Sequence, residues 1–207
     1  MNMPHSLKQT IYVVDDDQAV RESLCWLLES VDLPVVTYAS AQEFLADYNP
    51  EMGGCLILDV RMPGMSGLEL QNKLIEIECT LPILIITGHG DVPMAVRALK
   101  NGAVDFIEKP FNDQKLLERI QHCLDQDRAQ REARYMERVM RERYEQLTPR
   151  EQEVLTRVVA GKLNKVIADE LGISSKTVEA HRANIMEKMH ASSLAELVTM
   201  CVTVGLR

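Results

Sequence analysis

Paired or closely spaced cysteines are absent from this chain of 207 residues. Its five cysteines are scattered, odd in number and never separated by only two residues. This pattern argues against a disulfide framework and against a cysteine-based zinc site. Cys25, Cys55 and Cys201 lie in apolar runs, where we expect reduced thiols in a core.

Long apolar runs are also missing. No stretch reaches the roughly 18 residues that a membrane-spanning helix needs, and residues 1–10 lack the apolar segment of a signal peptide. We therefore expect a cytoplasmic protein without a membrane partner.

The net charge of −8 is unfavourable for binding nucleic acid, but the charge is unevenly distributed. Residues 1–121, 122–147 and 148–207 carry net charges of −9, 0 and +1. The length allows two domains of ordinary size. The C-terminal part can therefore approach a phosphate backbone without strong overall repulsion.

Residues 1–124 alternate short apolar runs with longer helical patterns. Five strands are predicted, and they end at or next to Val14, Tyr38, Asp59, Thr87 and Ile107. Because these runs are almost uniformly apolar, they predict a doubly wound α/β fold of the flavodoxin-like kind, with a five-stranded parallel sheet and helices on both faces. The active site of such a fold lies at the carboxyl ends of the strands.

Residues 125–146 contain neither Gly nor Pro and alternate Arg with Asp and Glu, which predicts a helical linker. An approximate apolar heptad runs through the linker and is interrupted at Arg143. Its members are Ala129, Ala133, Met136, Met140 and Leu147. Two interpretations remain open, a solvated helix or a coiled coil that forms with a partner.

Residues 147–207 are predicted to form an all-α domain of four helices. Thr148-Pro149-Arg150-Glu151 has the pattern of a capping box with proline at the first helical position. The helices are expected at about 148–160, 164–171, 175–189 and 193–204. The turn at Gly172 between the second and third is typical of a helix-turn-helix. The expected core residues are Val166, Ile167, Leu171, Ile173, Val178, Ile185 and Met189.

Polar side chains follow the predicted strands of the N-terminal domain. They are Asp15 and Asp16, Asp59, Thr87 and Lys109. Clustered carboxylates need a cation, and Mg²⁺ prefers one or two carboxylates together with water and phosphate oxygens. Asp59 can then attack a phosphoryl donor while Mg²⁺ and Lys109 stabilise the transferred charge and Thr87 binds a phosphoryl oxygen. Any one of these acids taken alone is better explained as a solvated loop residue.

The combination resembles the receiver domains of two-component response regulators over residues 8–124. The resemblance rests on the acid pair, the segment LDVRMPGMSG at 58–67, Thr87 and Lys109-Pro110. It implies that Asp59 is the phosphoacceptor and that Lys109 pairs with the phosphoryl group. It also implies that Asp16, assisted by Asp15, Asp59 and the backbone carbonyl of Arg61, binds Mg²⁺.

Further roles follow from the same resemblance. The Lys109-Pro110 peptide is expected to be cis. Thr87 and Phe106 would form the conformational switch, and a plain core role is the alternative for Phe106. Arg61 and His89 would flank the site and tune hydrolysis of the phosphoryl group, although an exposed loop position explains His89 equally well.

The C-terminal domain resembles the LuxR-type helix-turn-helix at 147–155, 164–168 and 177–182, so the whole chain resembles the FixJ/NarL-type response regulators. By position, Glu179, Ala180 and Ala183 face the major groove, and Arg182 is a further candidate. Phosphate contacts are expected from Lys162, Lys165, Lys176, Thr177, His181 and Lys188. The fourth helix resembles a dimerising helix, with a plain core role as the alternative.

The resemblance implies a transcription regulator rather than an enzyme. Its expected partners are a sensor histidine kinase, double-stranded promoter DNA, RNA polymerase and, after phosphorylation, a second copy of the chain. A phosphatase that forms a phospho-aspartate is one alternative, but its motif needs a second Asp where this chain has Arg61. A quorum-sensing regulator would leave Asp59 and Lys109 without a purpose. A regulator that works without phosphorylation is the third alternative.

Overall fold

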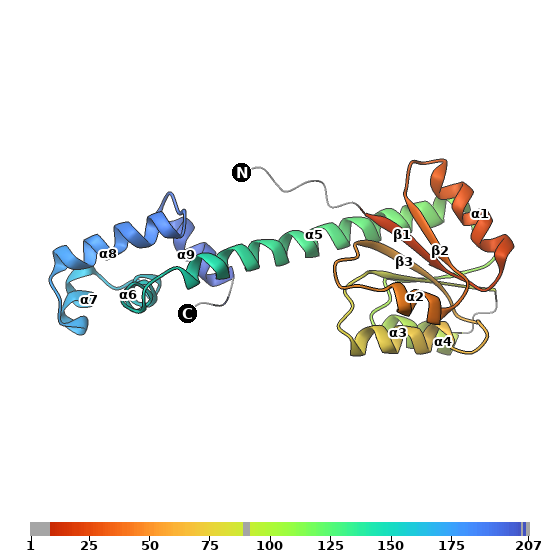
Figure 1. Ribbon diagram of the computed structural model, residues 1–207, viewed down its shortest axis with the longest axis horizontal. Coiled ribbons are helices and arrows are strands. Elements are labelled where there is room, and N and C mark those ends of the chain that lie inside the picture. The colour runs from red at the N-terminus through yellow and green to blue at the C-terminus, as the bar shows by residue number, and fades with distance from the viewer. Residues whose placement is uncertain (1–8, 89–91, 204, 206–207) are drawn as a thin grey trace. The chain divides into compact units, whose positions relative to one another are not determined.

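The computed structural model describes residues 9–88, 92–203 and 205 (Figure 1). The chain divides into two compact units, residues 1–130 and 131–207, which we describe separately. In the described part of the chain, no helix is both long and apolar enough to cross a membrane.

The first unit contains one sheet of five parallel strands in the order β2-β1-β3-β4-β5. The strands are β1 (Thr10–Val14), β2 (Val35–Tyr38), β3 (Gly54–Asp59), β4 (Ile83–Thr87) and β5 (Asp105–Glu108). Each strand lies within one residue of its predicted bounds. The predicted doubly wound parallel sheet is therefore confirmed, and its strand order is that of the flavodoxin-like fold.

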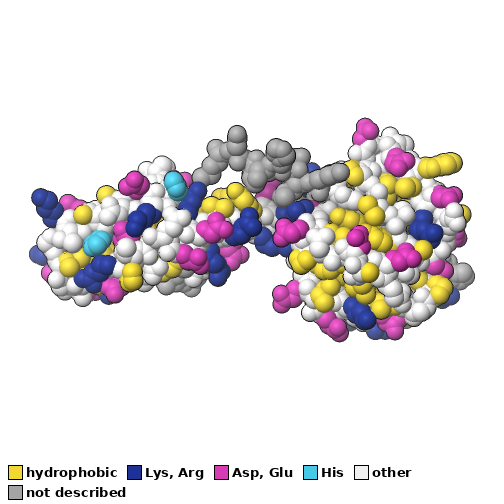
Figure 2. All heavy atoms as spheres, viewed as in Figure 1, with side chains coloured by type: hydrophobic (Ala, Val, Ile, Leu, Met, Phe, Trp, Pro, Cys, Tyr) yellow, Lys and Arg dark blue, Asp and Glu magenta, His cyan; other side chains and the backbone are white. Residues whose placement is uncertain are grey.

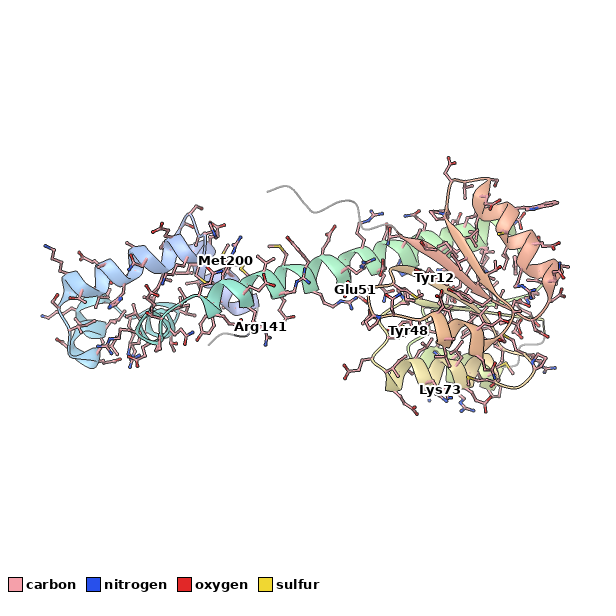
Figure 3. All side chains as sticks on the ribbon, viewed as in Figure 1. Tyr12, Tyr48, Glu51, Lys73, Arg141 and Met200 are labelled. Atoms are coloured by element: carbon pink, nitrogen blue, oxygen red, sulfur yellow. The ribbon has the colours of Figure 1, made fainter. Side chains whose placement is uncertain are left out.

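Helices cover both faces of the sheet because side chains of successive strand residues point to opposite faces (Figure 1). Ile11 and Val13 pack with α1 (Gln18–Glu29) and α5 (Asp113–Glu145). Tyr12 and Val14 pack on the opposite side. The helices on that side are α2 (Ala41–Asp47), α3 (Gly67–Glu76) and α4 (Val92–Lys100). On that face, the ring of Phe44 packs near those of Tyr12 and Tyr48, with centroids 6.2 and 6.1 Å away. The two tyrosines are labelled in Figure 3.

The loop after β3 is held directly against that strand. A Cβ atom on Gly67 would lie 2.1 Å from the carbonyl oxygen of Asp59, so only glycine fits there. The backbone N–H of Gly67 donates to the Val60 carbonyl, 2.9 Å away, and Ser66 caps α3 in a capping box with Glu69. This local packing fixes the backbone on both sides of Asp59.

Helix α5 runs past residue 124, the predicted end of the first domain, and continues without a break to Glu145, so the predicted linker is helical up to that residue. Asp127, three residues beyond the predicted end, is buried. Its Oδ2 accepts hydrogen bonds from the backbone N–H of Gly54 and from Gln9 Nε2, both 2.9 Å away. The contacts of the first unit therefore extend beyond the predicted domain end.

The second unit contains α6 (Pro149–Val159), α7 (Asn164–Leu171), α8 (Ser175–Lys188) and α9 (Leu194–Thr203), which confirms the predicted four helices. Ile167, Val178 and Ile185 lie in its core as predicted, but Val166 is 42% exposed and the prediction for it was wrong. The end of α5 also belongs to this unit, because Tyr144 packs against the core and Leu147 is part of it.

This packing uses part of the predicted heptad of α5. Met140 and Leu147 are buried. Ala129, Ala133 and Met136 are exposed, so only these three members of the stripe remain available to a partner.

Candidate functional site

Lys109 joins two carboxylates at the carboxyl ends of the strands. Its Nζ lies 2.6 Å from Asp15 Oδ2 and 2.8 Å from Asp59 Oδ1. Asp15 follows β1, Asp59 ends β3 and Lys109 follows β5, so the parallel sheet brings together residues that are far apart in the sequence. Both carboxylates are buried, whereas Lys109 keeps 19% of its side chain exposed.

Backbone groups fix the remaining carboxylate oxygens. Asp15 Oδ1 accepts from the N–H of Asp17 at 3.0 Å, and Asp59 Oδ2 accepts from the N–H of Arg61 at 2.6 Å. The carbonyl of Asp15 accepts from Arg21 Nη1 at 2.7 Å. These contacts orient both acids before any ligand arrives.

The electrostatics of the site are set by burial and by the ammonium group. Burial raises the pKa of the Asp59 carboxyl, and the hydrogen bond from Lys109 offsets this only in part. Burial alone would lower the pKa of Lys109, but its hydrogen bonds to Asp15 and Asp59 outweigh that effect and raise it. Lys109 is therefore a protonated, charge-stabilising group at neutral pH.

The predicted switch residues lie beside this cluster. Thr87 ends β4 and is fully buried, and its carbonyl accepts from the N–H of Lys109 at 2.8 Å. Phe106 in β5 is half-buried against the core. The Lys109-Pro110 peptide is cis, as predicted. Arg61 is exposed, and His89 lies outside the described residues.

Of the three predicted carboxylates, Asp15 and Asp59 are buried beside Lys109, whereas Asp16 is exposed. Among the described residues, no three His, Cys, Asp or Glu side chains form a ready-made metal site. The donor set still suits Mg²⁺, which needs only one or two carboxylates and completes its shell with water and phosphate oxygens. Two buried acids beside a single lysine also leave an excess of negative charge.

In the second unit, α8 presents most of the residues predicted to contact DNA. Val178 and Ile185 anchor the helix in the core. Of the predicted DNA contacts on α8, the exposed ones are Lys176, Thr177, Glu179, Ala180 and Ala183, and the half-buried ones are His181, Arg182 and Lys188. Ser174 caps the helix by accepting from the N–H of Thr177. On the side that Figure 2 shows, the basic side chains of this unit stand among acidic ones and do not merge into one large patch.

Four of the predicted DNA contacts have side-chain partners within the protein, and one of them is Thr177, whose Oγ1 lies 2.8 Å from Ser174 Oγ. Lys188 Nζ lies 2.7 Å from Oε2 of the buried Glu151, Lys162 pairs with Glu170, and Arg182 Nη1 donates to Asn164 Oδ1 at 2.8 Å. The capping-box pattern pointed to the hydrogen bonds between Thr148 and Glu151, but nothing in the sequence pointed to Lys188, 37 residues away.

The comparisons with known proteins cover both units. Residues 11–121 match the family described as "Response regulator receiver domain", and residues 145–201 match "Bacterial regulatory proteins, luxR family". Nodulation protein W of Bradyrhizobium diazoefficiens is 46% identical over 201 residues, which cover 97% of this chain and 88% of that protein. Transcriptional regulatory protein FixJ of the same organism is 45% identical over 96% of this chain and 97% of its own length.

Among solved structures, the response regulator StyR is similar with a TM-score of 0.86 and 48% identity, covering 94% of this chain and 98% of that one. A flavodoxin-like sheet with a Lys–Asp cluster at its strand ends, followed by a helix-turn-helix, defines a receiver coupled to a DNA-binding domain. The chain belongs to the response regulators with a LuxR-type DNA-binding domain, and it is a phosphorylation-activated transcription regulator of a two-component system.

Proposed function

We propose that Asp59 is the residue that receives the phosphoryl group, with a sensor histidine kinase as donor. The observation that carries this proposal is the contact of Lys109 with Asp59, because an ammonium group there can stabilise charge on the transferring group. Asp59 is the carboxylate that ends the central strand and is held by the N–H of Arg61. Thr87 would bind a phosphoryl oxygen and, with Phe106, form the switch.

Asp15, Asp16, Asp59 and the carbonyl of Arg61 would hold Mg²⁺, with Asp16 as the main ligand. When bound, the ion supplies neutralising charge for the phosphoryl oxygens. Arg61 stands where a phosphatase that forms a phospho-aspartate would need its second Asp, and a helix-turn-helix has no place in such an enzyme. Both points favour a regulator over an enzyme.

The proposed functional domains are the receiver at 1–124, the linker at 125–146 and the DNA-binding domain at 147–207.

Phosphorylation would favour a homodimer by remodelling the face formed by residues 91–124. The dimer would bind promoter DNA in the bacterial cytoplasm and act on transcription together with RNA polymerase. Glu179, Ala180 and Ala183 would read bases, whereas Lys165, Lys176, Thr177 and His181 would contact phosphates. Lys162, Lys188 and Arg182 are weaker candidates because their internal partners compete with DNA.

The function is tested by selecting DNA from a random pool with the full chain, with and without acetyl phosphate and Mg²⁺. We expect enrichment of one sequence that depends on phosphorylation, and sedimentation of the same samples should show a larger dimer fraction. Equal enrichment and equal sedimentation in both samples would favour a regulator that works without phosphorylation.

Mutations should distinguish residues that read bases from residues that only contact phosphates. Glu179 is exposed, and an acid near DNA is unfavourable unless it accepts from a base, such as cytosine N4. Glu179→Ala should therefore relax preference at one base pair by about 1–3 kcal/mol while non-specific binding holds or strengthens. Lys176→Ala and Lys165→Ala should weaken binding to all sequences and each lower the salt slope by about one unit.

The measurement is a salt titration of each variant on the selected sequence and on scrambled DNA. Equal loss of affinity on both DNAs for Glu179→Ala would mean that Glu179 does not read a base.

A further inference from the structure

Arg143 interrupts the apolar heptad of α5, and the structure gives it a specific contact. Its Nη1 donates to the backbone carbonyl of Met189 at 3.1 Å. Met189 is the C-cap residue of α8, the helix that carries the predicted base-reading residues. Carbonyls at the end of a helix have no partner within the helix, and a cation is favourable there because of the helix dipole. The arginine thus ties α5 to the end of the recognition helix.

The same guanidinium also acts on the start of α9. Hydrogen bonds from Ser192 lower the pKa of Glu196, and the charge of Arg143 contributes to this shift. Glu196 Oε2 in turn accepts from the backbone N–H of Ser192 at 2.7 Å. Arg143 therefore acts where α8 ends and α9 begins.

The neighbours of Arg143 attach the last turn of α5 to the rest of the unit. Tyr144 packs against the core, and Gln152 Nε2 of α6 lies 3.4 Å from the carbonyl oxygens of both Tyr144 and Leu147. Among these contacts, the bond from Arg143 is a hydrogen bond to the residue that ends α8. A simple linker would not need it, and a coiled coil would favour an apolar residue at this position.

We propose that Arg143 is a positioning residue that couples the linker helix to the recognition helix, so that a change in α5 alters how α8 is held. The inference rests on the proposed function, because it assumes DNA binding through α8 and activation through the receiver. Helix α5 is continuous from Asp113 to Glu145, so the helix that begins in the receiver also carries Arg143.

The test compares Arg143→Met with Arg141→Met in the full chain. Arg141, labelled on α5 in Figure 3, is exposed and pairs with Glu137 at 3.1 Å within the same helix, so it is a matched control. For each chain, the Kd for the selected DNA is measured with and without acetyl phosphate and Mg²⁺, and the extent of phosphorylation is read by mass. Arg143→Lys keeps the positive charge and a single ammonium donor group. This variant keeps the inference testable if Arg143→Met does not fold.

Allosteric coupling typically corresponds to an affinity ratio of about 5–150-fold between the two states. We expect Arg143→Met to bring this ratio close to one while phosphorylation stays complete, Arg143→Lys to retain part of it, and Arg141→Met to retain all of it. An unchanged ratio in Arg143→Met, or an equal loss of affinity in both states, would overturn the inference and leave the proposed function standing. If Arg143→Met instead raises the affinity ratio and the fraction of dimer, the inference is overturned and α5 forms a coiled coil. A ratio of one in the unmutated chain would overturn the proposed function itself.

Discussion

A chain that carries Asp59→Asn should take up no phosphoryl group from acetyl phosphate and Mg²⁺, whereas the unmutated chain should take up one. The carboxamide is not a nucleophile toward phosphorus, so the loss is expected to be complete rather than partial. The measurement is the intact mass of the protein after incubation with the phosphodonor.

Asp105→Asn is the matched control for this experiment. Asp105 begins β5 and forms an ion pair with Arg119 at 2.9 Å, away from the Lys109 cluster. Its substitution should leave labelling unchanged. Labelling of Asp59→Asn to the level of the unmutated chain would show that another residue is the acceptor.

Replacement of Glu151 by Ala should destabilise the DNA-binding unit by about 2–4 kcal/mol, because the change removes the side-chain half of a capping box and a charged hydrogen bond. Glu151 is only 3% exposed, and its Oε2 accepts from the N–H of Thr148 at 2.8 Å and from Lys188 Nζ at 2.7 Å. Lys188 is about one-third exposed, so solvent screens the ion pair and the cap contributes a large share. Hydrogen exchange of the slowest amides in residues 149–203 reports the local free energy of opening.

The pH dependence of this stability has a definite sign. Burial opposes ionisation of Glu151, but the hydrogen bonds from Lys188 and Thr148 outweigh it and lower its pKa from 4.5 to about 2. Because the pKa of Glu151 is lower in the folded unit than in the unfolded chain, its ionised carboxylate stabilises the fold at pH values above about 4.5. This stabilisation is lost as the pH falls from about 4.5 toward 2.

In Glu151→Ala this acid-dependent loss should be absent. Glu153→Ala is the control, because Glu153 lies on the same helix but pairs with Arg150 at an exposed site, where an ion pair contributes about 0–1 kcal/mol. If both variants lose stability equally, or if Glu151→Ala keeps the acid transition, then the ion pair and cap do not determine the stability of this unit.

The sequence predicted those features that depend on local pattern. The strand bounds followed from apolar runs, and the meeting of Asp15, Asp59 and Lys109 followed from their positions after parallel strands. The capping box at Thr148 reflects contacts across only three residues. The roles of the site residues and the domain boundaries stay predictions.

Features that depend on distant partners could not be predicted. Lys188 was assigned to DNA because it is a lysine on the recognition helix, whereas its partner Glu151 lies on α6. Val166 fits the helical period of a core residue, but α7 turns it toward solvent. The heptad of α5 gave no sign that Arg143 bonds to Met189, because a periodic pattern describes one helix and not its neighbours.

The buried carboxylate of Asp127 bears on how such proteins exchange modules in evolution. A recombination that joined this receiver to a different effector at residue 124 would remove the acceptor of the Gly54 amide and one partner of Gln9. A buried amide left without an acceptor costs about 1–3 kcal/mol, a large fraction of the stability of an ordinary domain. A viable fusion therefore has to inherit at least the turn of α5 that contains Asp127, so part of the linker helix travels with the receiver.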